Sequence, residues 1–238
     1  LALMYAKGEG VKKDLKEAEK WARKAAAQGN PKGQFGLGWA YHQGIGVKKD
    51  LKEARDINIA TSKAIKNKCG KGFKGVLYGG FMATSSGVKL IEYNARFGDP
   101  EAMNVLSLLE SDFVEICIAI AEGNLNEIDV SFQKKATVCK YAVPEGYPDN
   151  PVKGESIDVS NIDNSDTLFF ASVDYKNASL VESGSRTVAV IGVANSIAEA
   201  ETIAEKEISS IKGPLFHRSD IGKKSLIQKR IDHMMLLR

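Results

Sequence analysis

The stretch that decides the fold is EYNARFGDPE, residues 92–101. It contains the end of a strand-like run at 88–94, in which residues suited to a half-buried strand are frequent. The stretch ends with Asp99 and Pro100. Aspartate is a favoured helix cap and proline suits the first helical position, so we predict that Asp99 caps a helix extending from about residue 100 to 123.

The same stretch brings chemically active side chains together. Residues two apart on a strand face the same side, so Glu92 and Asn94 would present two oxygen donors to one space. Magnesium prefers oxygen ligands and usually takes only one or two of them from protein. Arg96 would share that side if the strand continued, where it could hold a phosphate or carboxylate. A Glu–Asn pair on an exposed strand is commonly just solvated, so spacing alone leaves both interpretations open.

The surrounding pattern predicts an α+β fold. Residues 73–82 and 88–94 are two β-rich runs around a Ser/Gly turn, which is typical of an antiparallel hairpin. Beyond Gly123 a second β-rich unit is expected, with a helix over 196–211. Its strand candidates are 136–143, 157–159, 167–173 and 187–193.

The N-terminal segment contains an internal repeat. The run VKKDLKEA at residues 11–18 recurs 36 residues later at 47–54, and a period of that size indicates a solenoid of helix pairs. Within the first copy, Gly8 and Gly10 should end one helix, and Asp14 with Glu17 should cap the next. Helical patterning continues beyond the second copy, so the join to the following module is expected to be a continuous helix, broken near Gly70.

This segment resembles the Sel1-like repeat in its Tyr, Gly-x-Gly-Val, Asp, Ala, Trp and Ala-Ala-x-x-Gly positions. The resemblance implies a protein-interaction scaffold over residues 1–55. The alternative is that these positions only specify packing. The segment also holds fewer units than the three that repeat arrays usually need.

Residues 92–101 match every fixed position of E-x-N-x-R-F-G-D-P-E, the signature of phosphoribosylamine–glycine ligase, an ATP-grasp family. Further blocks of the chain match that family in order, so the resemblance extends over about residues 57–238. These blocks are 75–78, 108–109, 111–113, 146–148, 184–186 and 218–222. The sequence at residues 104–105 and 139–141 resembles that of archaeal members in particular. We therefore predict Sel1-like helical repeats at 1–55, the C-terminal part of an ATP-grasp domain at 56–125, and the ligase C-terminal subdomain at 126–238.

The resemblance implies specific roles. Glu92 and Asn94 would bind the magnesium (or manganese) that bridges ATP phosphates, and Arg96 beside them would act as a catalytic and cofactor-binding residue. Arg186 would bind the cofactor from the C-terminal subdomain, although a structural role is an equal alternative. His217 is a matched position for which packing is expected. The implied reaction uses ATP to join glycine to 5-phosphoribosylamine through an acyl phosphate, in purine biosynthesis.

Composition excludes several other classes of protein. The net charge is only +3, and the basic residues are interspersed with acidic ones, so nucleic acid is not an expected partner. No apolar run is long enough to span a membrane. The three cysteines form no CxxC pair, and Cys117 and Cys139 lie among apolar neighbours, which predicts core positions and a reducing, cytoplasmic setting.

The family's N-terminal half has no counterpart here, and no Gly-rich phosphate loop replaces it. Three interpretations follow. The chain is a ligase fragment that is inactive alone, a Sel1-repeat scaffold carrying a non-catalytic ligase remnant, or a chimera created in sequence assembly.

Overall fold

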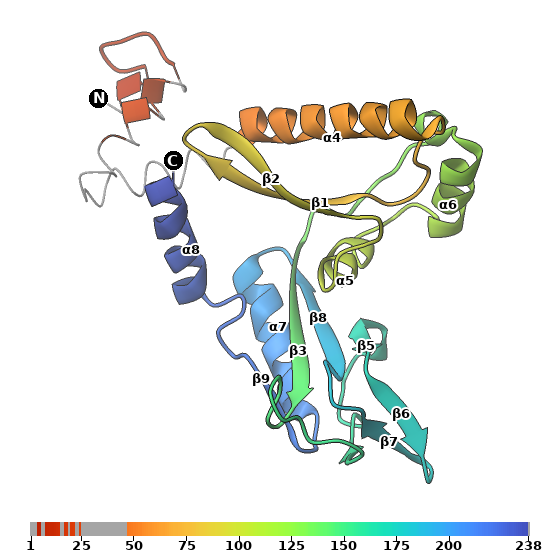
Figure 1. Cartoon of the computed structure of the whole chain (residues 1–238). Coiled ribbons are helices and arrows are strands. Elements are labelled where there is room, and N and C mark those ends of the chain that lie inside the picture. The colour runs from red at the N-terminus through yellow and green to blue at the C-terminus, as the bar shows by residue number, and fades with distance from the viewer. Residues whose placement is uncertain are drawn as a thin grey trace. The chain divides into compact units, whose positions relative to one another are not determined.

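The computed structural model describes residues 47–237, together with residues 4–5, 8–14, 17–18, 20–21 and 24. Most of its helices and strands are labelled in Figure 1. The chain divides into two compact units, one formed by Leu1–Arg96 with Gln228–Arg238 and the other by Phe97–Ile227. Each unit is considered by itself below.

The described part of the N-terminal segment agrees with the predicted glycine turns and with one of the two hydrogen bonds of the predicted capping box, while the Asp14 N–H donates to the Tyr5 carbonyl at 3.0 Å. Gly8 and Gly10 have φ values of 79° and 74°, in the left-handed region that glycine tolerates. The Asp14 carboxylate accepts a hydrogen bond from the Glu17 backbone N–H at 3.1 Å, as expected of a helix cap. The predicted second copy of the repeat turn, at residues 41–46, lies outside the described residues, so the repeat itself stays a prediction.

Helix α4 (Val47–Cys69) is continuous across residue 55, as expected, and the Gly70 N–H closes its last turn onto Lys66. The hairpin of β1 (Tyr78–Thr84) and β2 (Gly87–Asn94) is antiparallel, which confirms the prediction for this region. Two side-chain hydrogen bonds tie it to α4. Glu53 accepts from the Val88 backbone N–H at 3.0 Å, and the Tyr93 hydroxyl donates to Asn58 at 2.6 Å.

The second unit contains a four-stranded sheet in the order β5-β8-β3-β9, with α7 packed on it. The elements are β3 (Ala136–Pro144), β5 (Leu168–Phe170), β8 (Val188–Ala194), α7 (Ile197–Ser210) and β9 (Leu215–His217). Ser196 and Glu199 form a full capping box at the start of α7. The core is apolar side chains between sheet and helix, among them Val138, Val190 and Ala204.

Close approach of the helix to the sheet depends on one glycine. A Cβ atom at Gly192 on β8 would lie 1.8 Å from the Ala200 carbonyl oxygen and 2.9 Å from the Ala204 nitrogen. Only glycine therefore lets the backbone of β8 lie against the backbone of α7.

A three-stranded sheet in the order β4-β7-β6 completes the β-rich part. The bounds of its strands are Ser156–Ile157 (β4), Val173–Lys176 (β6) and Ser179–Glu182 (β7). The predicted single strand at 167–173 is therefore wrong, because this stretch contributes β5 to one sheet and the start of β6 to the other. The remaining elements are the 3-10 helices η1 (Leu125–Glu127) and η2 (Ser165–Thr167) and the helix α8 (Lys224–Leu237).

The predicted single helix at 100–123 is also wrong, since the chain forms α5 (Glu101–Leu106) and α6 (Phe113–Glu122). The break occurs because the Asp112 carboxylate caps a new helix, accepting hydrogen bonds from Val114 N–H at 2.7 Å and Glu115 N–H at 3.1 Å. Gly123 ends α6 in the left-handed conformation, as predicted.

Candidate functional site

The predicted metal ligands lie at the end of β2. Glu92 and Asn94 are neighbours on the strand, and the Asn94 amide donates a hydrogen bond to the Glu92 carboxylate at 3.2 Å. The hairpin register pairs Gly80 with Glu92 and Phe81 with Leu90, so Ile91 is an extra residue on β2. Bulges of this kind re-aim the side chains beside them and are frequent at functional sites. The bulge therefore sets the direction of the Glu92–Asn94 pair.

The donor chemistry of this pair fits a hard cation. A carboxylate and an amide oxygen are ligands that magnesium accepts, and two protein donors are typical when phosphates and water supply the others. Within the described residues, no group of three or more His, Cys, Asp and Glu side chains is arranged to hold a metal. Two protein donors leave most of the coordination shell of such a cation to phosphates or water.

Arg96 does not share the strand geometry of this pair. β2 ends at Asn94, so the alternation that would have placed Arg96 on the same side as Glu92 does not extend to it. Its side chain is exposed. The spacing argument for Arg96 is therefore not supported by the fold, and only the family resemblance carries its role.

Asp99 has a different role from the one predicted. Pro100 occupies the cap position of α5 and no side chain caps that helix. The Asp99 carboxylate instead accepts hydrogen bonds from the Tyr141 hydroxyl at 2.8 Å and from Arg186 Nη1 at 2.9 Å. The Arg186 guanidinium also lies over the Tyr141 ring, 5.5 Å from its centroid. The helix-cap prediction for Asp99 is wrong because these two distant side chains bind its carboxylate.

These contacts decide how the cluster titrates. Burial, followed by the hydrogen bond to Asp99, raises the pKa of Tyr141. Burial alone would lower the pKa of Arg186, but its pair with Asp99 raises it. Burial and the charge of Asp99 also raise the pKa of Cys139 to about 12. Tyr141 and Cys139 are therefore protonated and Arg186 is charged at neutral pH, so this cluster offers a fixed cation and no thiolate nucleophile.

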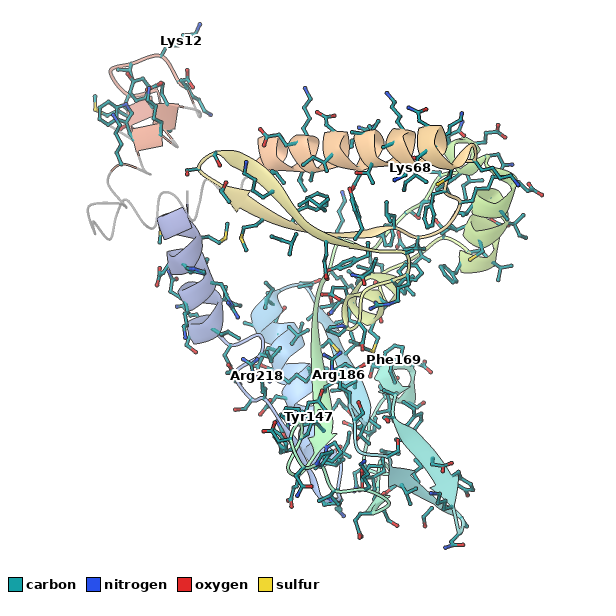
Figure 2. All side chains as sticks on the ribbon, viewed as in Figure 1. Lys12, Lys68, Tyr147, Phe169, Arg186 and Arg218 are labelled. Atoms are coloured by element: carbon teal, nitrogen blue, oxygen red, sulfur yellow. The ribbon has the colours of Figure 1, made fainter. Side chains whose placement is uncertain are left out.

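Arg186 is labelled in Figure 2, just before β8, and its side chain is 44% exposed. A guanidinium has five N–H donors, and the bonds to Asp99 use one of its nitrogens. Donors consequently remain on an accessible side chain. That arrangement is compatible both with the anchoring role and with binding an anionic group.

Among the described residues, a charged cluster centred on Lys140 was not predicted from the sequence. Lys140 on β3 is fully buried and donates to Glu201 at 2.8 Å, to Glu205, and to the Ser219 carbonyl at 3.2 Å. Lys223 also pairs with Glu201, at 2.7 Å. A lysine alternating with apolar residues on a predicted strand was the only available signal. Its partners lie more than 60 residues away, so their identity was not accessible.

Two smaller predictions concern this unit. His217 is half-buried on β9, with its Nε2 3.4 Å from a Glu205 carboxylate oxygen, which agrees with the expected packing role. Cys117 was expected in the core but is exposed on α6, whereas Cys139 is partly buried. The prediction for Cys117 is wrong because apolar neighbours along a helix occupy all of its faces and only one face of α6 is covered.

The fold and its sequence place this chain in the ATP-grasp class. Residues 5–102 match the family "Phosphoribosylglycinamide synthetase, ATP-grasp (A) domain", and residues 137–224 match "Phosphoribosylglycinamide synthetase, C domain". The first match begins within the stretch for which repeats are predicted. The division at residues 55/56 and 125/126 likewise stays a prediction.

The relatives of this chain include several phosphoribosylamine–glycine ligases. The chain is 57% identical to the ligase of Methanocaldococcus jannaschii over 188 residues, or 78% of this chain, and 52% identical to that of Methanosarcina barkeri over 185 residues. The crystal structure of the Thermotoga maritima ligase superposes with a TM-score of 0.64 at 27% identity, covering 73% of this chain. This chain is therefore homologous to the C-terminal part of phosphoribosylamine–glycine ligase.

The match covers only part of each relative. The chain spans 42% of the length of both methanogen ligases and 43% of the Thermotoga maritima chain. The rest of each of those proteins lies outside the region that aligns with this chain.

Proposed function

We infer that this chain supplies the C-terminal part of a phosphoribosylamine–glycine ligase, which joins glycine to 5-phosphoribosylamine with ATP and a divalent metal in purine biosynthesis. The observation that carries the proposal is the paired Glu92 and Asn94 at a bulged strand end, in a chain 57% identical to such a ligase. The methanogen relatives favour an archaeal-like origin. We expect the reaction to take place in the cytoplasm, and none of the described helices is long and apolar enough to cross a bilayer.

In this proposal the Glu92 carboxylate and the Asn94 amide oxygen hold magnesium or manganese. The bound ion would neutralise charge on the ATP phosphates during phosphoryl transfer. Arg96 would hold an anionic substrate group as a catalytic residue, since a guanidinium can pair with phosphate or carboxylate through two hydrogen bonds. Arg186 would contribute a fixed positive charge to cofactor binding, oriented by Asp99. No covalent enzyme nucleophile is required, in agreement with the protonated state of Cys139.

The chain alone should not complete this reaction. A metal held by only two protein donors is weakly bound because magnesium loses its hydration shell reluctantly, and the ligands that bind the nucleotide would have to come from elsewhere. An ADP-release assay with glycine, phosphoribosylamine and magnesium ATP tests this directly. Turnover near the roughly 10 per second of a typical enzyme by the isolated chain would contradict it.

The positive arm adds the N-terminal part of the M. jannaschii ligase, which has no counterpart in this chain, by co-expression. The assembled protein should form glycinamide ribonucleotide. Glu92→Gln should then lower turnover at least about a hundredfold by removing the only charged metal ligand. Glu127→Gln, a matched change at an exposed position on η1, should leave turnover unchanged. A folded complex that makes no product, or one indifferent to Glu92→Gln, would overturn the proposed function or its site.

A further inference from the structure

The turn that carries Arg186 connects the two sheets of the second unit. It extends from the end of β7 at Glu182 to the start of β8 at Val188. Strand β7 belongs to the three-stranded sheet and β8 to the four-stranded sheet (Figure 1). The direction in which the Arg186 side chain leaves the backbone therefore depends on how this connection is held.

The buried carboxylate of Glu182 holds the connection at its start. Glu182 is only 1% exposed. One carboxylate oxygen accepts a hydrogen bond from the Glu155 N–H at 3.1 Å, and the other accepts one from the Gly184 N–H at 3.0 Å. Both partners are backbone groups and not basic side chains. Burying a carboxylate is costly unless its oxygens are hydrogen-bonded, so the folded protein needs both of these bonds.

Gly184 is the residue at which the chain turns. Its φ of 89° lies in the left-handed region that glycine tolerates. The side chain of Lys153 covers it, with Cε 2.5 Å from the position that a Cβ atom would take. Because Glu182 binds the N–H of this residue, the carboxylate fixes the turn itself and not only the strand before it.

Further hydrogen bonds hold the same turn to the residue before β6. The Ser172 N–H donates to the Arg186 carbonyl at 2.8 Å, and the Ser183 N–H donates to the Ser172 carbonyl at 3.1 Å. The hydroxyl oxygens of Ser172 and Ser183 are 2.6 Å apart. The backbone of Arg186 is therefore held in place two residues after the glycine.

The far end of the Arg186 side chain is held as well. Its guanidinium donates to Asp99 and lies over the Tyr141 ring. An arginine with free rotation would lose side-chain entropy when it binds a ligand. One that is held at both ends binds an anion with little reorganisation, which strengthens the electrostatic contact.

We propose that Glu182 is a positioning residue for Arg186, fixing the turn so that the guanidinium is preorganised to bind a phosphate group of ATP. The proposal rests on the proposed function, in which Arg186 binds the cofactor. Glu182 acts through the backbone, since its oxygens bind only the N–H groups of Glu155 and Gly184. A purely structural role would predict a loss of stability without a change in the order of the Arg186 side chain.

Side-chain NMR of the present chain tests the positioning directly. In the unaltered chain the Arg186 Nε–Hε group should have a heteronuclear NOE near that of the backbone amides, and Arg186→Lys assigns the signal by removing it. Glu182→Gln replaces one acceptor oxygen by a donor that faces an N–H. The NOE of Arg186 should then fall towards that of Arg230, an exposed arginine on α8.

The amide shifts of β8 and α7 report whether the Glu182→Gln chain remains folded. Glu155→Gln is the matched control, because its exposed side chain is changed while its backbone N–H still binds Glu182. It should leave the Arg186 signal as it is. A folded Glu182→Gln chain in which Arg186 stays ordered overturns the proposal, and so does an unaltered chain whose Arg186 is as mobile as Arg230.

Ser183→Ala provides a second variant if Glu182→Gln does not fold. Ser183 is exposed, and its replacement removes the hydroxyl contact with Ser172 in the same turn. The NOE of Arg186 should fall in this variant too, by a smaller amount. An Arg186 signal that this variant leaves unchanged, in the absence of a folded Glu182→Gln chain, counts against the proposal.

Kinetics of the protein assembled with the N-terminal part of the M. jannaschii ligase add a second readout. Glu182→Gln should raise KM for ATP at least about fivefold and KM for glycine less than about twofold. In an Arg186→Lys background the same change should raise KM for ATP by less than about twofold, because two residues that act through one contact are not additive. Effects that multiply would overturn the proposal.

The two proposals fail separately. An assembled protein that forms no product contradicts the proposed function, while the NMR signal of Arg186 still decides whether Glu182 orders that side chain. An assembled protein that forms product, in which Arg186 stays ordered after Glu182→Gln, contradicts the positioning role alone.

Discussion

Strand β8 and strand β2 belong to regions that differ sharply in burial. Val188, Ala189, Val190 and Ile191 on β8 are each 0% exposed, between neighbouring strands and α7. By contrast, none of the described side chains from residue 51 to 96, around β1, β2 and α4, is fully buried. A two-stranded hairpin is marginal by itself and depends on the helix packed against it, whereas a four-stranded sheet under a helix encloses a core of its own. The region around β8 is therefore stable through its own packing. The region around β2, which carries the candidate metal ligands, depends on contacts with other parts of the protein.

Charged side chains divide in the same way. Lys140 is enclosed on β3 by two glutamates, where its charge is matched at short range. Glu92 is exposed at the end of β2, with an amide as its neighbour. Burial makes the first arrangement essential to the fold and exposure makes the second available to a ligand. Substitutions should therefore change the free energy of unfolding strongly around Lys140 and weakly around Glu92.

The largest effect is expected for Lys140→Ala. Removing a fully buried lysine leaves Glu201 and Glu205 without their shared partner, at a cost of about 3–5 kcal/mol. Urea unfolding followed by circular dichroism measures this, and hydrogen exchange of the β8 amides assigns the transition to the second unit. Lys223→Ala removes a lysine that is 45% exposed from the same network and should cost much less, because solvent screens its pair with Glu201. An equal loss of stability in the two variants would show that the burial of Lys140 does not determine its contribution to the free energy of unfolding.

A second comparison uses one glycine from each region. Gly192→Ala on β8 should lower the free energy of unfolding by about 3 kcal/mol, because its Cβ would lie 1.8 Å from a backbone oxygen of α7. Gly80→Ala on β1 has its nearest neighbour, in the Glu92 side chain, at 3.6 Å, and should change stability by about 0.5 kcal/mol or less. The same urea series tests both. Similar values would mean that the hairpin is packed as tightly as the sheet.

The pH dependence should come mainly from the buried network and be smaller than the effect of Lys140→Ala. Burial alone would raise the pKa values of Glu201 and Glu205, but hydrogen bonds from Lys140 and their other partners lower both below 4.5. A lowered pKa in the folded state gives stability that is present above about pH 4.5 and lost as the pH falls through the folded-state value. Unfolding measured from pH 7 to pH 3 should therefore show a decline that Glu205→Gln reduces. A curve for Glu205→Gln identical to that of the unaltered chain would contradict the assignment.

The smallest effect on stability is expected for Glu92→Gln. An exposed side chain at a strand end contributes little to folding, so its replacement should change the free energy of unfolding by about 0.5 kcal/mol or less. Metal-dependent nucleotide binding by the assembled protein should nevertheless be lost. Magnesium titration followed by NMR, with and without ATP, compares metal binding by the Glu92→Gln variant with that of the unaltered protein. A loss of stability as large as that of Gly192→Ala would mean that Glu92 is a structural residue.

The sequence predicted elements best where both ends carried clear signals. Helix α7 begins after the capping serine Ser196 and has regularly spaced apolar residues, and it was located within one residue at each end. The hairpin around the Ser/Gly turn was also correct. By contrast, the β6–β7 hairpin turns through Asn177 and Ala178, with φ values of 49° and 62°. Because that turn has no glycine, the usual signal was missing and β7 was not predicted.

The sequence by itself determined the class of the chain and the neighbouring position of Glu92 and Asn94, because side chains two apart on a strand share a face whatever surrounds them. Tertiary structure alone decided what binds Asp99, which lies 42 residues from Tyr141 and 87 from Arg186 along the chain. It also decided that Lys140 is enclosed by glutamates of α7. Backbone periodicity acts over a few residues, whereas a carboxylate or ammonium group binds whichever opposite charge the packed chain brings within about 3 Å.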